Sequence, residues 1–144
     1  MGHSYLEFYY HFVWSTKRRE RLISTEIEPI LFAYIGKRCV EMGVFVYALN
    51  GVEDHVHLVC SVPPKIPVAE LLDKIKGGSS HYMNHLENSS HVLYWQAGYG
   101  GLTFGKKDLK RIVAYVQNQK LRHAANNLWS SLEVSEVKEN RCFR

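Results

Sequence analysis

The chain has 144 residues, of which 46% are hydrophobic and 22% are charged, and its formal net charge is +4. This length is enough for a single domain over residues 1–144 to bury its own core. No apolar run approaches the roughly 20 residues of a membrane span and no signal-peptide pattern is present, so we expect a cytoplasmic protein with no membrane partner. Cys39, Cys60 and Cys142 are odd in number and scattered, which favours reduced thiols over disulfides or a zinc cluster.

The first elements are predicted to be a strand and a helix. Residues 5–16 alternate with the period of a β-strand. One face carries Leu6, Phe8, Tyr10, Phe12 and Trp14, and the other carries Glu7, Tyr9, His11 and Val13. Thr25 and Glu28 match a capping box, which opens a helical pattern that Gly43 is expected to end.

A hairpin and a second helix are expected next. Residues 44–50 and 55–62 form two short strand patterns, with a turn predicted around Gly51. A helical pattern then runs from Val68 to Leu86 through Gly77 and Gly78. Each glycine costs a helix about 1 kcal/mol relative to alanine, so the pair predicts a bend or the close approach of another backbone.

The last elements complete an α+β order. Residues 92–104 predict an irregular fourth strand, and a third helix is expected from about Lys106 to His123. Residues 124–144 form a weakly patterned tail, to which no helix or strand is assigned. The order β-α-β-β-α-β predicts a ferredoxin-like split βαβ fold, in which an antiparallel sheet has helices on one face, plus a C-terminal tyrosine-bearing helix.

Two histidines stand out in the strand "HVHLVCSV". Side chains alternate along a strand, so His55 and His57 share one face, and we expect that face to be open because the helices cover the other. Their Cα atoms are roughly 7 Å apart, which lets both imidazoles reach one divalent ion. Two ordinary strand histidines, each bonded to neighbours, are the alternative.

Tyr115 and Gln119 are one helical turn apart. A phenol and an amide oxygen beside two imidazoles suit phosphoryl transfer assisted by Mg²⁺ or Mn²⁺. A packing role for the tyrosine and a solvated position for the glutamine remain open.

Three segments, "DHVHLV", "WQAGYG" and "YVQNQ", give a family resemblance from Tyr5 to His123. The sequence resembles the single-tyrosine HUH transposases of small bacterial insertion sequences, the IS200-like family, with its domesticated relatives tied to repetitive extragenic palindromes. The chain departs from the family pattern in "GLTFGKKD", where a serine-rich turn is common, and at Lys120, where an acidic residue is common. His123, one turn beyond Gln119, is a candidate spare ligand or phosphate contact, with a capping or surface role as the alternative.

The resemblance implies a complete chemistry. His55, His57 and Gln119 would hold Mg²⁺ or Mn²⁺, and Tyr115 would cleave single-stranded DNA near hairpins, leaving a 5′-phosphotyrosine and a free 3′-OH. Members act as homodimers on hairpin-bearing DNA, which places the protein at the nucleoid when it is bound, and many exchange the tyrosine helix between subunits.

Basic residues form two clusters that suit DNA phosphates, although solvated surface is the simpler interpretation of either. They are Lys17, Arg18 and Arg19, and Lys106, Lys107, Lys110 and Arg111. Tyr94, Trp95 and Tyr99 either stack on unpaired bases or belong to the core.

Three alternatives to a transposase stay open. One is a domesticated, non-catalytic protein that binds DNA hairpins. The others are a replication-initiator or relaxase nuclease, and a ferredoxin-like RNA-binding module with incidental histidines.

Overall fold

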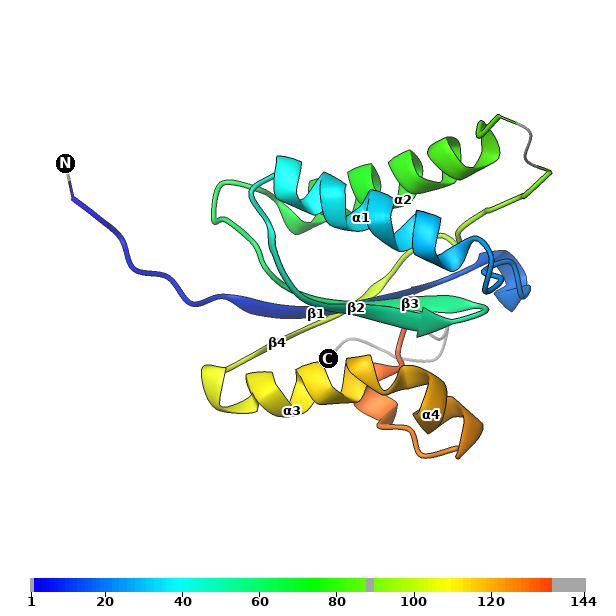
Figure 1. Ribbon diagram of the computed structural model, residues 1–144. Coiled ribbons are helices and arrows are strands. Elements are labelled where there is room, and N and C mark those ends of the chain that lie inside the picture. Colours follow the sequence, from blue (N-terminus) through cyan, green and yellow to red (C-terminus); the bar gives the residue numbers. More distant parts are fainter. Residues whose placement is uncertain (1, 88–89, 136–144) are drawn as a thin grey trace, which may run out of the picture.

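A four-stranded antiparallel sheet lies at the centre of the computed structural model, which describes residues 2–87 and 90–135 (Figure 1). The strands are β1 (Tyr9–Ser15), β2 (Phe45–Val52), β3 (His55–Ser61) and β4 (Gly100–Phe104), in the order β2-β3-β1-β4. The helices are α1 (Glu28–Glu41), α2 (Val68–Asn84), α3 (Lys106–Gln117) and α4 (Gln119–Ala124), with 3₁₀ turns η1 (Lys17–Arg19) and η2 (Ser130–Leu132). This order is that of a split βαβ sheet, so the predicted α+β fold class is confirmed.

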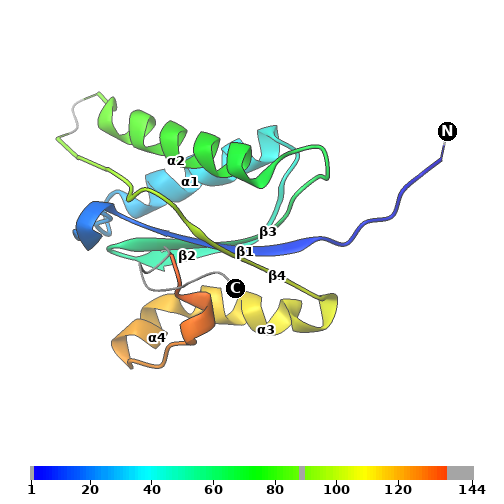
Figure 2. The same ribbon diagram turned by 180° about the vertical axis from the view of Figure 1, so that it is seen from behind.

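The main core lies between the sheet and the pair α1 and α2 (Figure 1). Phe12 and Trp14 of β1 point into it together with Leu58 of β3, as the alternation predicts. The opposite face is covered by α3 and α4 (Figure 2), where Ile112 and Val116 pack with Val59. The expectation of an open histidine face was therefore wrong, because the apolar stripe of α3 needs a surface to bury and finds it there.

Several element ends differ from the sequence predictions. The first strand begins at Tyr9, not at residue 5, because only residues from Tyr9 onward pair with β4. The Thr25–Glu28 capping box does not form, since the Ile27 amide donates to Ser24 Oγ (3.3 Å). Gly43, with φ of +74°, follows α1 in the left-handed conformation that favours glycine, as predicted.

The hairpin turn lies later than expected. β2 continues through Gly51 to Val52, and the turn is made by Glu53 and Asp54, which places Asp54 directly beside His55. In α2, a Cβ on Gly78 would stand 2.5 Å from the Tyr34 hydroxyl, so the predicted close approach exists, but a side chain makes it and not a backbone.

The third predicted helix is broken. α3 ends at Gln117, whose carbonyl accepts a hydrogen bond from Asn50 Nδ2 (3.0 Å), and α4 starts at Gln119. Lys120 Nζ then bonds Glu28 Oε1 (2.8 Å) and Asn50 Oδ1 (2.7 Å), which ties α4 to the end of β2 and to α1. The unusual Lys120 thus has a structural role.

The aromatic residues before β4 divide between core and surface. Trp95 lies edge-on to Trp14, and Tyr99 edge-on to Phe12, so both pack on the core. Tyr94 is exposed and stays available to a ligand.

The described residues contain no helix long and apolar enough to cross a membrane. Cys39 and Cys60 are buried free thiols, and the prediction for Cys142 lies outside the described residues.

Candidate active site

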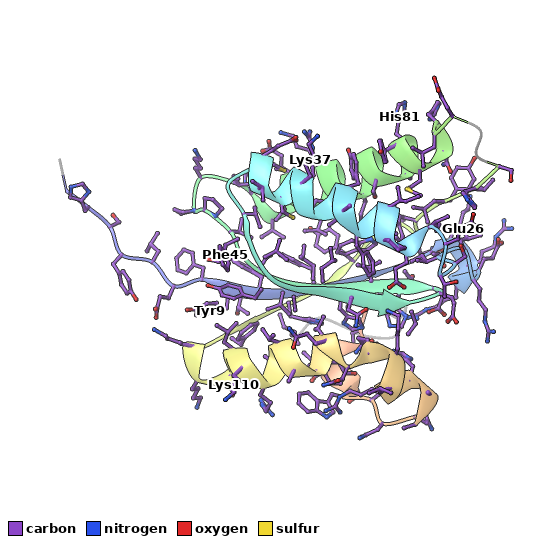
Figure 3. All side chains as sticks on the ribbon, viewed as in Figure 1. Tyr9, Glu26, Lys37, Phe45, His81 and Lys110 are labelled. Atoms are coloured by element: carbon purple, nitrogen blue, oxygen red, sulfur yellow. The ribbon has the colours of Figure 1, made fainter. Side chains whose placement is uncertain are left out.

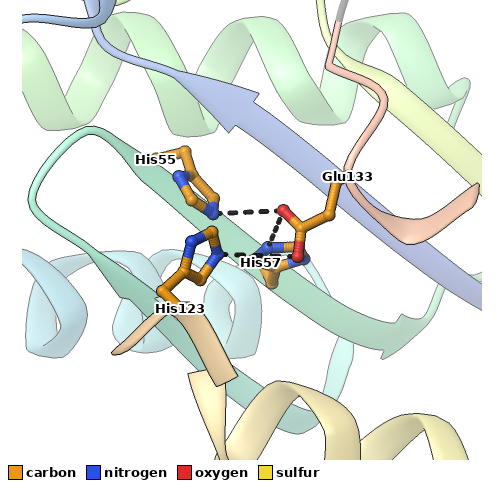
Figure 4. Close-up of side chains that lie close together, drawn as sticks. All are labelled: His55, His57, His123 and Glu133. Carbon is orange, nitrogen blue, oxygen red and sulfur yellow. Dashed lines mark ion pairs between the residues drawn. The ribbon is translucent and has the colours of Figure 1, made fainter. Parts of the chain in front are cut away.

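His55 and His57 lie under the sheet, on the face that α3 and α4 cover (Figure 4). The shared face is confirmed, since Val56 and Leu58 point into the opposite core. Their exposed fractions are 1% and 0%, so both imidazoles are removed from solvent.

Each histidine has one ring nitrogen fixed by a neighbour. His55 Nδ1 bonds Asp54 Oδ1 (2.7 Å), and His57 Nδ1 bonds Nε2 of the buried His11 (2.8 Å). Burial lowers the pKa of His11 to about 3, so this residue is a neutral partner. These bonds leave the Nε2 atoms of both site histidines directed elsewhere.

Both Nε2 atoms lack a hydrogen-bond partner among the described residues, although both are buried. A buried polar atom without a hydrogen bond costs about 1–3 kcal/mol, and these two face the Glu133 carboxylate at ion-pair distance. Neutral imidazole nitrogens are donors to transition-metal ions, so the pair fits a divalent cation such as Mn²⁺.

Glu133 comes to the histidines from the C-terminal segment (Figure 4). Its Oε2 lies 3.3 Å from His55 Nε2 and 3.2 Å from His57 Nε2, and its Oε1 lies 3.6 Å from His123 Nε2. Burial alone would raise the pKa of the Glu133 carboxyl, but the imidazoles of His55 and His57 outweigh burial and lower that pKa below its usual value. The site therefore holds a carboxylate among imidazoles.

Tyr115 lies in the same cluster and has no exposed surface. Its hydroxyl donates to Glu133 Oε1 and accepts from the Trp129 backbone N–H (3.1 Å). The Trp129 indole stacks on its ring (4.6 Å between centroids), and the Arg122 guanidinium lies 4.7 Å from each of the two rings. Burial, with the bond to Glu133 adding to it, raises the pKa of Tyr115 to about 12.

Gln119 is also buried beside the cluster. Its Nε2 lies 3.4 Å from Glu133 Oε1, and its Oε1 lies 3.0 Å from His123 Nε2. When His123 donates this bond, its Nε2 has no lone pair for a metal. The fold thus brings together the four residues that the sequence singled out for chemistry, namely His55, His57, Tyr115 and Gln119.

Sequence reasoning missed four neighbours of these residues: His11, Asp54, Trp129 and Glu133. His11 was placed on the correct strand face, and Asp54 adjoins the histidine motif, so both had a local signal. Trp129 and Glu133 fall in the unassigned tail, where the apolar pair Leu128 and Trp129 among polar residues was the available hint of docking.

The two basic clusters lie at opposite ends of β1 (Figure 1). Lys17 and Arg18 are exposed near the histidines, whereas Arg19 also contacts Asp54 (3.9 Å) and Ser135 Oγ (3.2 Å). Arg18 and Arg19 have φ of 56° and 55°, an uncommon left-handed backbone for non-glycine residues.

The second basic cluster lies at the start of α3. Lys110 projects from the helix away from the sheet (Figure 3), and Lys107 is exposed. Lys106 pairs with Glu7 (3.1 Å) and Arg111 with Asp108 (3.4 Å), so two of its four cations already have acidic partners.

The tail crosses β4 at Gly100. A Cβ on Gly100 would stand 1.5 Å from the carbonyl oxygen of Val134, a distance that forces the tail backbone to move. A glycine at this position of "WQAGYG" is therefore what allows the segment carrying Glu133 to lie against the sheet.

Gly100→Ala is expected to displace residues 129–135 and to lower stability by about 1–3 kcal/mol, the usual cost of forcing atoms into a packed site. Hydrogen exchange followed by mass spectrometry should show faster exchange in peptides spanning 126–135. Gly36→Ala, in open space on α1, is the matched control and should leave these peptides unchanged. Unchanged exchange in Gly100→Ala would mean that the tail does not dock there.

Comparisons with known proteins agree with the fold and with the sequence motifs. A family model described as IS200-like transposase matches residues 4–119. The ISDra2 transposase TnpA of Deinococcus radiodurans is 24% identical over 115 residues, which cover 76% of this chain and 82% of that protein. The transposase for insertion sequence element IS200 of Salmonella typhimurium is 26% identical over 124 residues, covering 83% and 81%.

Two solved structures have the same fold. A candidate transposase from Deinococcus radiodurans gives a TM-score of 0.62 at 25% identity, covering 83% of this chain and 96% of that one. A REP-associated tyrosine transposase bound to a REP hairpin gives 0.64 at 18% identity, covering 85% and 74%. Because the family model spans most of the sequence, the chain belongs to the IS200-like transposase family.

Proposed function

We propose that this transposase cleaves and rejoins single-stranded DNA near hairpins, with Tyr115 as nucleophile and with His55, His57 and Gln119 as ligands of Mg²⁺ or Mn²⁺. The observation that carries the proposal is the meeting of a buried phenol with two buried imidazole nitrogens that form no hydrogen bond, all in one cluster. The transposase relatives and the hairpin bound by one structural neighbour support DNA as the substrate.

The cleavage step balances with one nucleophile and one leaving group. The Tyr115 oxygen forms a bond to phosphorus while the bond from phosphorus to the 3′ oxygen breaks. The Tyr115 hydroxyl gives up its proton and the departing 3′ oxygen gains one to leave as a 3′-OH, so protons balance, and the 5′ side stays on the protein as a phosphotyrosine. A 3′-OH attacking that phosphotyrosine reverses the step, so strands rejoin without another energy source.

The surrounding residues orient the reacting groups. Asp54 and His11 hold the Nδ1 atoms of the two site histidines, which keeps both Nε2 atoms directed at the ligand. Glu133 Oε1 accepts a hydrogen bond from the Tyr115 hydroxyl, which fixes the orientation of that hydroxyl. A bound divalent ion supplies Lewis-acid polarisation of the phosphodiester.

Access to Tyr115 requires movement of the tail and of the Arg122 side chain on α4. Because Tyr115 is fully buried under Trp129 and Arg122, these side chains must leave its ring before a phosphate reaches the hydroxyl. The same burial favours a second candidate function, a DNA-hairpin binding protein that no longer cleaves.

A denaturing gel distinguishes the two functions. The protein is incubated with Mn²⁺ and a labelled pool of hairpin-bearing single strands, and the nuclease predicts a covalent protein–DNA band that EDTA prevents. Hairpin binding with no band under any metal condition would support the binding protein.

Both basic clusters are proposed DNA contacts, and Lys17 and Arg18 are exposed just beyond the end of β1 that pairs with His55. Replacing both by Gln should lower DNA affinity and reduce the slope of log K against log salt by about 1.4 for single strands, since each lost phosphate contact removes about 0.7. Arg19 is left intact because it also contacts Asp54.

The control is the pair Lys37→Gln and Lys74→Gln, two exposed cations on α1 and α2. Fluorescence anisotropy between 50 and 300 mM salt gives both slopes. Equal losses in the two double variants would show that the positive charge acts without a defined contact.

A further inference from the structure

We propose that Glu133 is a direct ligand of the divalent ion, together with His55 and His57. The inference rests on the proposed function, because it concerns the same ion. Glu133 lies beyond residues 4–119, so the family match itself gives this residue no role.

The donor distances are those of neighbouring ligands around one ion. Two atoms that each lie about 2.1 Å from an ion are about 3.0 Å apart at a right angle and about 3.4 Å apart at the tetrahedral angle. Glu133 Oε2 lies 3.3 Å from His55 Nε2 and 3.2 Å from His57 Nε2. Neither nitrogen forms a hydrogen bond with another described residue, so the Glu133 carboxylate is the group that faces both of them, at ion-pair distance.

The two carboxylate oxygens have different partners. Oε2 faces the histidine pair, while Oε1 accepts the hydrogen bond from the Tyr115 hydroxyl. Gln119 Nε2 also lies on the Oε1 side, at 3.4 Å. One carboxylate therefore joins the nucleophile to the ion site and fixes the separation between them.

The backbone around Glu133 is anchored on both sides. Leu132 packs with Ile112 in the apolar cluster between the sheet and α3, and Ser135 Oγ accepts a hydrogen bond from Arg19 (3.2 Å). The side chain is mostly buried, with 16% exposed, so the carboxylate is presented to the histidines in a defined position.

The donor set also favours particular metals. Two imidazoles with one carboxylate, beside the Gln119 amide, suit Mn²⁺ or another borderline cation, whereas Mg²⁺ prefers oxygen ligands and keeps several waters. The carboxylate also offsets one of the two positive charges of the ion inside a buried site.

The test is the affinity of the full chain for Mn²⁺ in the absence of DNA. It is measured from the electron paramagnetic resonance signal of free Mn²⁺ and by calorimetry. Glu133→Gln keeps the size of the side chain and a hydrogen-bond acceptor for Tyr115, and Glu133→Ala removes both. We expect each variant to bind Mn²⁺ at least about tenfold more weakly than the wild type. Glu70→Gln, an exposed carboxylate on α2, should bind like the wild type, and thermal melts should show that all variants are folded.

The direction of the change decides the result. Unchanged affinity in both Glu133 variants would overturn the inference while leaving the proposed function intact. Tighter binding would also overturn it, because the carboxylate would then compete with the ion for its place. A wild-type chain that binds no Mn²⁺ would overturn both the inference and the metal part of the proposed function.

Discussion

Tyr115→Phe is expected to lower the rate of covalent capture of DNA by at least ~1,000-fold, while the affinity for hairpins stays within a few fold of the wild type. The substitution removes only the attacking oxygen, and the phenyl ring can still stack on Trp129 and lie under Arg122. The Trp129 N–H loses its acceptor, which costs about 1–3 kcal/mol in a buried site.

The same denaturing gel measures this effect, with binding followed separately by anisotropy. Tyr82→Phe is the matched control, because this tyrosine stacks on Tyr34 over α1 and α2, on the other side of the sheet. If Tyr115→Phe lost binding and capture equally, the hydroxyl would be a structural group and the nucleophile would have to be sought elsewhere.

The histidine pair was predictable because a strand has a strict period of two. Once Phe12 and Leu58 were assigned to the core, the neighbouring His11 and His57 had to lie on the other face. The meeting of Tyr115 with His57 was expected from the family resemblance and not from periodicity, which says nothing of distant contacts. The structure places their ring centroids 6.1 Å apart.

The break after Gln117 was not predictable from helical propensity. Residues from 106 to 123 keep a helical pattern. The interruption depends on Asn50 of β2, whose side-chain amide donates a hydrogen bond to the Gln117 carbonyl. Such an interaction is tertiary, and the local pattern contains no sign of it.

The tail shows the same limitation more strongly. Glu133 lies in a stretch without period, and its partners His55 and Tyr115 precede it in the chain by 78 and 18 residues. Motifs predicted the site residues as far along the chain as Gln119. The site residues beyond Gln119 could not be predicted because they belong to no motif.

His57→Ala is expected to remove Mn²⁺ binding and Mn²⁺-dependent cleavage together. The imidazole is fully buried, and its loss takes away one of the two proposed Nε2 ligand atoms and leaves His11 without its hydrogen-bond partner. Mn²⁺ at 100 times its dissociation constant should stabilise the wild type by about 2.7 kcal/mol, and this gain should vanish in the variant. Thermal melts with and without Mn²⁺ measure it.

His57→Gln fills more of the space left by the imidazole than alanine does, so it tests whether unfolding causes the loss of Mn²⁺ binding. His81→Ala on α2 should keep the full stabilisation by Mn²⁺. A normal Mn²⁺ shift in both His57 variants would exclude His57 as a ligand.

Mixing His57→Ala with Tyr115→Phe extends the test to the arrangement of subunits. In the structure Tyr115 lies beside the histidines of its own chain, with the hydroxyl and the His57 ring both in contact with Glu133. If each chain completes its own site, every site in the mixture lacks either the nucleophile or a ligand, and no covalent band should form. A band restored by mixing would show that the tyrosine helix serves a second chain, the exchanged arrangement that many family members use. The mixture therefore tests the contact between Tyr115 and His57 within one chain, on which the proposed geometry depends.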